Sequence, residues 1–275
     1  MTFQHLVDSF RPLLLFHPHE TYFPISIDRY LRHSTLTEDV VVVEIDSRRG
    51  DGDDGRTKRR SSPSSFWNVG TLTTANICTA YTDAAATTLR LKRSHRARAA
   101  GSQSDDAPMY ARVSETNSEF IISYTFLYAF NEPYRVLRFW EVGAHDCDIE
   151  HVTMRIDRDT RELTHVFFSA HGSADGLWLD ASSVSRVGSR PLVYVAVGSH
   201  ATYPSAGTYV RIFGLANDVT SADGYILDTN RVIVIDEQTE WNCFQTSTCN
   251  APRFHSYWNA ESATSTNALR RFVGL

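Results

Sequence analysis

Hydrophobic positions along the chain fall mostly in short runs rich in Val, Ile, Thr, Tyr and Phe, separated by turn residues. This pattern is typical of β-strands, which favour β-branched and aromatic side chains. The predicted strands cover residues 40–45, 120–130, 134–142, 149–156, 163–170, 192–197, 208–213 and 231–236. Helical periodicity is scarce, with residues 75–91 and 260–272 as its best candidates. We therefore predict one mainly β domain over residues 1–275, an antiparallel β-sandwich with long loops and a few short helices.

Two segments interrupt this pattern, residues 47–65 and residues 91–108. They are rich in Arg, Asp, Gly and Ser and contain almost no large apolar side chain, so they cannot offset the entropy of ordering. The sequence predicts mobile loops at both places. Their basic residues could form a patch for phosphates or acidic lipid, or could simply be the solvated charges of two loops. These residues are Arg56, Lys58, Arg59, Arg60, Arg90, Lys92, Arg93, Arg96 and Arg98.

The composition restricts the class of protein. The chain has 275 residues, 42% of them hydrophobic, and a formal net charge of −5, as expected of a water-soluble protein that folds without a metal or a disulfide. The slight acidic excess argues against a nucleic-acid binder. No apolar run reaches the roughly 18–20 residues that span a membrane. The first residues lack the features of a signal peptide, so we expect a cytoplasmic protein or one whose leader precedes this numbering.

The cysteines indicate no metal site of their own. Four cysteines are too few for a disulfide scaffold, and no Cys-x-x-Cys motif is present, so we do not expect a structural zinc site. Cys243 and Cys249 enclose a short polar loop and could be bridged, and the sequence leaves this open.

An acidic and histidine-rich cluster occupies residues 143–151, at the start of a predicted strand. Because alternate side chains of a strand share a face, Asp148 and Glu150 have the same parity as the apolar positions that follow, and His151 has the opposite parity. Two carboxylates at the mouth of a buried face lose hydration and repel each other unless a cation or protons compensate them.

His145 can bring a neutral nitrogen to the same end of the strand. Together with Asp148 and Glu150 it would form a nitrogen and oxygen ligand set for a divalent cation, Mg²⁺ or Ca²⁺ first and Zn²⁺ or Mn²⁺ as alternatives. In the competing interpretation, the two carboxylates pair with arginines such as Arg155 or Arg135, and His145 only packs.

Two further histidines end neighbouring strands. A hairpin with Ile156 opposite Leu163 sets Asp148 against His171, whereas a slip of one residue turns His171 away; we take the first register, because it gathers the cluster at one rim. His200 follows the apolar strand 192–197 and is either near this site or a loop hydrogen-bonding residue. We predict His171 and His200 as the catalytic residues.

Four blocks of the sequence, in order, resemble a known family. They are PLLLFHPHETYFP at 12–24, GAHDCDIEHVTMR at 143–155, FSAHG at 168–172 and PLVYVAVGSHATYP at 191–204. They resemble the blocks of the family named after vacuolar protein sorting protein 62, which has fungal, bacterial and plant members, the plant ones long catalogued as a domain of unknown function. This resemblance spans nearly the whole chain.

The central block is also similar to the Gly-His-Arg-His-Asp-Trp-Glu heptapeptide of the necrosis- and ethylene-inducing-peptide-like toxins. Those toxins are β-sandwiches resembling actinoporins, and they hold a divalent cation with the first His, the Asp and the Glu of the heptapeptide. The resemblance implies the same fold here, His145, Asp148 and Glu150 as cation ligands, and His171 nearby.

The block departs from the heptapeptide at several positions. The second His of the heptapeptide is Cys147 here and its Trp is Ile149. A further upstream Asp ligand has only Asn131 or Glu132 as positional counterparts.

These features support two hypotheses on function. The first is a metal- or acid/base-assisted enzyme, a hydrolase or cyclase of secondary metabolism, that acts on an apolar small molecule or lipid. The alternative is a binding module without catalysis, which uses the cation to hold lipid or glycan head groups and makes peripheral contact with a membrane, helped by the basic segments.

Overall fold

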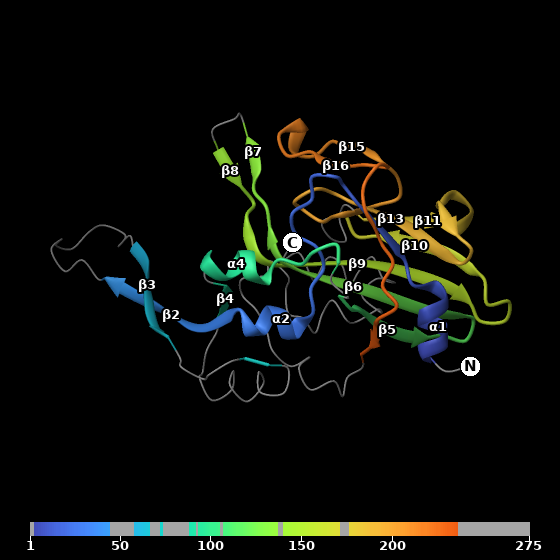
Figure 1. Cartoon of the computed structure of the whole chain (residues 1–275), viewed down its shortest axis with the longest axis horizontal. Helices are drawn as coiled ribbons and strands as arrows, with labels where there is room; N and C mark the ends of the chain where they lie inside the picture. The colour runs from blue at the N-terminus through green and yellow to red at the C-terminus, as the bar shows by residue number, and fades with distance from the viewer. Residues whose placement is uncertain are drawn as a thin grey trace, which may run out of the picture.

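The computed structural model describes residues 3–44, 58–66, 72–73, 88–91, 93–104, 107–136, 140–170 and 176–235. Within them, three α-helices are short: α1 (Phe3–Phe10), α2 (Ile27–Arg32) and α4 (Arg93–Ala99). None of the described helices is long and apolar enough to cross a bilayer. Strands make up most of the regular structure, and two main sheets enclose the core (Figure 1).

The larger sheet has the strand order β11-β10-β9-β6-β5-β18. Its long strands β6 (Glu119–Asn131) and β9 (His145–Asp157) run antiparallel side by side along most of their length (Figure 1). The remaining strands are β5 (Met109–Glu115), β10 (Leu163–Phe168), β11 (Leu177–Asp180) and β18 (Val232–Val234). Aromatic and β-branched residues dominate β6, and β9 carries the β-branched residues Ile149, Val152, Thr153 and Ile156, all of which favour strands.

The second sheet has the order β12-β13-β1-β17, with β14 added beside β13. Its strands are β1 (Leu13–Phe16), β12 (Arg186–Val187), β13 (Arg190–Val195), β14 (Thr202–Tyr203) and β17 (Ile226–Leu227). The central pair, β1 and β13, is parallel. A turn at residues 196–201 joins β13 to β14 and is closed by the Ala196 N–H, which donates to the Ala201 carbonyl over 2.9 Å.

The core lies between the inner faces of the two sheets, with α1 covering one end. Each large apolar side chain buried here contributes about 1.5–3 kcal/mol relative to exposure. The core includes Leu6, Val7 and Phe10 from α1, Leu14 and Phe16 from β1, Phe120, Ile122, Tyr124, Phe126 and Tyr128 from β6, Val152, Met154 and Ile156 from β9, and Val193 and Val195 from β13.

Smaller elements surround the two sheets. A three-stranded sheet contains β2 (Ser34–Glu44), β3 (Lys58–Phe66) and β4 (Thr88–Leu91), and two strand pairs are formed by β7 (Tyr134–Val136) with β8 (Trp140–Val142) and by β15 (Gly207–Tyr209) with β16 (Asp218–Thr220). Short 3₁₀ turns occur at η1 (Ala181–Ser183) and η2 (Ile212–Gly214).

The expected mainly β architecture of packed sheets is confirmed. Most strand pairs are antiparallel, as expected, and two pairs, β1 with β13 and β18 with β5, are parallel. These partners are far apart in the sequence, and local hairpin signals carry no information about such pairings.

The predicted mobile loops are also partly wrong. Residues 58–66 form β3, which the neighbouring β2 orders through a ladder of backbone hydrogen bonds, and residues 93–99 form α4. Of the predicted helices, residues 88–91 form β4 instead, and residues 260–272 lie outside the described part of the chain. The predicted strand at 208–213 ends at Tyr209 and gives way to η2.

Candidate functional site

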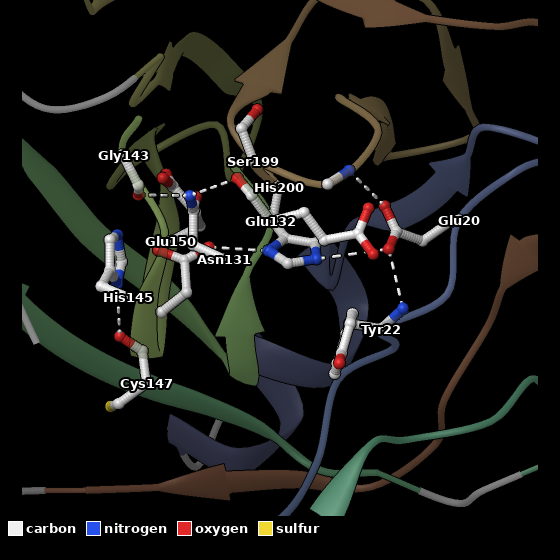
Figure 2. A network of polar contacts seen from close by, with 12 residues as sticks. Glu20, Tyr22, Asn131, Glu132, Gly143, His145, Cys147, Glu150, Ser199 and His200 are labelled. Carbon is white, nitrogen blue, oxygen red and sulfur yellow. Dashed lines mark hydrogen bonds and ion pairs between the residues drawn. The ribbon is translucent and has the colours of Figure 1, made fainter. Parts of the chain in front are cut away.

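The candidate site lies where the start of β9 meets the turn at residues 196–201, at one rim of the core. His200 is its centre and is fully buried. Its Nδ1 donates a hydrogen bond to Asp148 Oδ2 over 2.7 Å, and its Nε2 lies 3.4 Å from Glu20 Oε1, an ion-pair contact. The ring stacks on that of Tyr128 at 3.9 Å between centroids. Figure 2 shows the Glu20 carboxylate facing the His200 ring.

Glu20 is a buried anion held by backbone donors. The amides of Thr21 and Tyr22 each donate to its Oε1 over 2.8 Å, and the amide of Gly198 donates to its Oε2 over 2.9 Å. Burial by itself would raise the pKa of Glu20, but His200 and these hydrogen bonds more than compensate and lower it. Glu20 is therefore ionised at neutral pH.

His200 carries the matching positive charge. Burial alone would lower its pKa, but the carboxylates of Glu20 and Asp148 outweigh that effect and raise the pKa to about 10. Both ring nitrogens are therefore protonated at neutral pH, and both face carboxylates. Glu20, His200 and Asp148 form a buried carboxylate–imidazolium–carboxylate chain, which we call the histidine clamp.

Glu150 lies beside the histidine clamp, and its pKa is raised, whereas that of Glu20 is lowered. Asp148 and Glu150 are both almost fully buried on β9, where they lie opposite Tyr128 and Phe126 of β6. Burial and the charge of Asp148 raise the pKa of Glu150 well above its usual range, although Ser169 Oγ donates a hydrogen bond to its Oε2. Burial and the charge of Asp148 therefore both favour the protonated, neutral form of Glu150.

The Tyr128 hydroxyl provides a second neutral donor. It is fully buried, and among the described residues it has no hydrogen-bond partner. Burial, followed by the nearby charges of Asp148, Glu20 and Glu150, raises its pKa well above the usual range. The phenol therefore stays protonated.

The structure brings together three of the residues predicted from the sequence. Asp148, Glu150 and His200 meet at one rim, and the inward parity of the two carboxylates is confirmed. The competing interpretation, in which arginines neutralise these carboxylates, is not what the structure shows. Arg135 pairs instead with Glu141 at 3.7 Å, and Arg155 lies over the Trp178 ring.

His145 is set apart from the two carboxylates. It begins β9, and its Nδ1 donates to the Cys147 carbonyl over 3.1 Å, away from His200 (Figure 2). Within the described ranges, no group of three or more His, Cys, Asp and Glu side chains is arranged to hold a metal ion. The predicted divalent cation at His145, Asp148 and Glu150 stays a prediction.

His171 lies outside the described residues. The register that we expected to place it opposite Asp148 is wrong beyond Leu163. Leu163 does pair with Ile156, but a bulge before His165 shifts the ladder by one residue, so that Phe168 pairs with Val152. Bulges of this kind are set by local twist and packing, which the alternation of residues does not reveal.

Asn131 and Glu132, the positional counterparts of the heptapeptide's upstream Asp ligand, make other hydrogen bonds. The Asn131 side-chain amide donates to the Glu132 and Gly143 carbonyls, both over 2.9 Å, and Glu132 Oε1 accepts from Thr21 Oγ1 over 2.9 Å.

Cys147 is disulfide-bonded. The other three cysteines, including Cys243 and Cys249, lie outside the described residues.

Of the predicted basic patch, only Arg96 and Arg98 have described side chains. Arg96 pairs with Asp146 and covers the Phe130 ring, and Arg98 is exposed.

Sequence reasoning missed Glu20, Tyr128 and Ser169. Glu20 stood within the first block of the family resemblance, as an acidic residue directly after His-Pro-His, and that was its signal. Tyr128 has the inward parity of a core residue, so nothing in its pattern separated it from its aromatic neighbours.

Comparison with solved structures found several distant matches among necrosis- and ethylene-inducing-peptide-like proteins. NLPPya in complex with glucosamine has 12% identity and a TM-score of 0.46, with 90% of this chain and 83% of that chain covered. Non-toxic HaNLP3 has 14% identity and a TM-score of 0.44, with 93% and 89% covered. Necrosis and Ethylene inducing Protein 2 from the causal agent of cocoa's Witches Broom disease has 13% identity and a TM-score of 0.37, with 83% and 72% covered. Similarity at this level supports no argument about activity.

No curated protein matches the chain. One family model does match, that of vacuolar protein sorting-associated protein 62, and the match spans β9, β10, β13 and the turn that carries His200. Residues 122–247 of this chain therefore match the model of the vacuolar protein sorting-associated protein 62 family, the family that the sequence blocks resemble.

Proposed function

We propose that this protein is an enzyme that uses proton donors at the rim of its core to act on an apolar small molecule or lipid, by hydrolysis or cyclisation. The observation that carries the proposal is the histidine clamp beside the second buried carboxyl group, Glu150. A fold gains little stability from so many buried ionisable groups, since each must be compensated. Such groups are typical of catalytic sites.

Glu150 is the proposed general acid. A carboxylic acid kept protonated by burial and a neighbouring carboxylate is the usual arrangement of a proton donor in an active site. The Tyr128 hydroxyl would hydrogen-bond to the same acceptor, such as a carbonyl or ether oxygen of the substrate. Phe126, opposite Glu150 on β6, gives the site an apolar neighbour that suits an apolar substrate.

Asp148 and His200 would support this acid. Burial, and then the charge of Asp148, raises the pKa of Glu150, and His200 Nδ1 donates a hydrogen bond to Asp148. Because both ring nitrogens of His200 face carboxylates, we assign it a positioning role in place of the direct proton transfer expected from the sequence. His171 remains a predicted catalytic residue.

The test is turnover by wild-type protein and by the Glu150→Gln variant, which keeps the shape of the side chain but cannot donate a proton as an acid. Suitable probes are 4-nitrophenyl esters from acetate to laurate, and a total lipid extract followed by mass spectrometry. We expect a loss of roughly 100-fold or more in the variant. The matched control is Asp180→Asn, which removes an exposed carboxylate on β11 that pairs with the His165 ring. Equal turnover by wild-type and Glu150→Gln proteins would contradict the proposal.

Cation-dependent binding of a head group is a second candidate, and the orientation of His145 favours it. Its Nδ1 contacts a backbone carbonyl, the arrangement that orients many metal-ligating histidines and directs Nε2 toward the metal. The predicted ligands His145, Asp148 and Glu150 are not arranged around a common cation position, however, because the Asp148 carboxylate is directed to His200. Mg²⁺ or Ca²⁺ would supply positive charge to an anionic lipid or glycan head group.

Calorimetric titration with MgCl₂ and CaCl₂ tests the second candidate. It predicts binding that is lost in His145→Ala and Glu150→Gln variants, and salt-sensitive attachment to phosphatidylserine vesicles that chelator removes. Attachment that survives both chelator and high salt would contradict it.

A further inference from the structure

Asp218 is a buried carboxylate outside the proposed catalytic group. It opens β16 and is 1% exposed. Three hydroxyl groups donate to it: Ser199 Oγ over 2.6 Å, Tyr134 Oη over 2.8 Å and Tyr203 Oη over 2.7 Å. Arg211 Nη1 lies 3.7 Å from its Oδ2. Asp218 therefore joins segments that are separate in the sequence.

One of these donors is the direct neighbour of His200. Ser199 and His200 point in opposite directions from the turn, Ser199 to Asp218 and His200 to the two carboxylates of the clamp. A change in the position of Ser199 must therefore rotate or move the imidazole ring on the adjacent residue.

The backbone of this turn is strained. Gly198 has φ +75 and His200 has φ +57, which is the left-handed region. That region is unfavourable for residues other than glycine, and it persists in a fold only where the surroundings enforce it. The backbone hydrogen bonds of the turn include the His200 amide to the Ala196 carbonyl over 2.9 Å, the Val197 amide to the Val219 carbonyl over 3.0 Å and the Glu132 amide to the Gly198 carbonyl over 2.8 Å. The Ser199 side chain adds a further contact to this turn, its hydrogen bond to Asp218, at the residue directly before His200.

We propose that Asp218 is the positioning residue of the site: by holding Ser199, it keeps His200 in its left-handed conformation between Asp148 and Glu20. This inference rests on the proposed function for the meaning of the clamp, but it concerns the geometry of His200 alone. The donors suit a permanent anchor, because burial and then Asp218 itself raise the pKa values of Tyr134 and Tyr203, which keeps both hydroxyls protonated.

Two matched variants separate positioning from general stability. Ser199→Ala and Tyr203→Phe each remove one hydroxyl donor from the same buried carboxylate. Only Ser199 adjoins His200. The readout is the pair of side-chain N–H signals of the His200 ring in ¹H–¹⁵N spectra of the full chain at neutral pH, assigned by their loss in His200→Gln.

We expect the His200 ring signals to shift and to exchange with solvent roughly tenfold faster or more in Ser199→Ala, and to stay as in wild type in Tyr203→Phe. Asp218→Asn is expected to follow Ser199→Ala. Circular dichroism verifies that each variant is folded. Ring signals in Ser199→Ala that match wild type would overturn the inference, as would equal changes in Ser199→Ala and Tyr203→Phe.

Turnover is measured separately on the same variants. Ring signals that respond to Ser199→Ala in a protein without turnover would support the positioning role of Asp218 while contradicting the proposed enzyme. The two measurements therefore distinguish failure of the positioning role of Asp218 from failure of the proposed enzyme activity.

Discussion

At the scale of single residues, the site is defined by neighbouring groups with opposite protonation. His200 is charged where burial would favour the neutral ring, and Glu150 is neutral where solvent would favour the anion. The carboxylates of Glu20 and Asp148 favour the protonated imidazole, whereas burial, and then the charge of Asp148, favours the protonated form of Glu150. Both departures link the stability of the fold to pH.

His200 is expected to stabilise the fold in a definite pH range. Its pKa is raised from 6.5 to about 10. The stabilisation is therefore complete below about pH 6.5, the value for the unfolded chain, and is lost as the pH rises through 10. Thermal unfolding of wild type from pH 6 to pH 10 should show a falling melting temperature. A His200→Gln variant should be less stable by about 3–5 kcal/mol at neutral pH, because it leaves buried carboxylates unpaired, and should lack that alkaline decline. An identical pH dependence in both proteins would refute this linkage.

Glu150→Gln is expected to increase the stability of the fold at high pH, whereas His200→Gln decreases it at neutral pH. The raised pKa of Glu150 means that its contribution is complete below 4.5 and is lost as the pH rises through the folded value, since the buried anion is unfavourable. Glutamine cannot ionise, so the variant should gain stability over wild type as the pH rises, while losing turnover. Each kcal/mol gained should raise the melting temperature by roughly 2–4 °C. A variant that is less stable than wild type at alkaline pH would show that Glu150 is a structural residue.

At the scale of elements, the turn at residues 196–201 is the feature that positions the site. It needs a left-handed residue at Gly198, and an added Cβ there would lie 3.1 Å from the Glu132 side chain. Sequence reasoning identified Gly198-Ser199-His200 as a strand end but could not show where its side chains point. Its tertiary partners, Glu132 and Asp218, come from other parts of the chain.

Gly198→Ala is therefore expected to destabilise the protein and to displace His200. The matched control is Gly188→Ala, because Gly188 also has a positive φ, +63, but no atom within 4 Å of an added Cβ. The control should cost about 1–2 kcal/mol for backbone conformation alone, and Gly198→Ala should cost more through the contact with Glu132. Denaturant unfolding measures both. Equal losses in the two variants would mean that the Glu132 contact is unimportant.

The elements also show why part of the fold was predictable. Strands β6, β9 and β10 were predictable as strands, because β6 is a long run of aromatic and β-branched residues and a short polar turn joins β9 to β10. The parallel pairing of β1 with β13 and the bulge before His165 could not be predicted, because each depends on packing between distant segments. For the same reason, Asp148 and Glu150 were found as a pair on one strand, whereas Glu20 was found only from the structure.

At the scale of the whole molecule, the site forms only when the two sheets pack together. Glu20 follows β1, His200 follows β13, and Asp148 and Glu150 belong to β9 in the opposite sheet. The raised pKa of His200 depends on carboxylates from both sheets, Glu20 beside β1 and Asp148 on β9, so the full charge compensation requires all three segments. The histidine clamp thus connects the two sheets at the rim of the sandwich and also forms part of the candidate catalytic site.

The disulfide of Cys147 adds a constraint close to this rim, since Cys147 is fully buried on β9 next to Asp148. Disulfides persist in oxidising compartments, whereas the sequence predicted a cytoplasmic protein, so the redox state of this bond bears on where the protein functions. Alkylation of intact cells, with and without prior reduction, followed by mass spectrometry should show Cys147 protected until a reductant is added. The purified protein should also lose about 2–5 kcal/mol of stability on reduction, a loss that is absent in Cys147→Ser. Alkylation of Cys147 in unreduced but unfolded protein would show that the thiol is free and would remove the argument for an oxidising compartment.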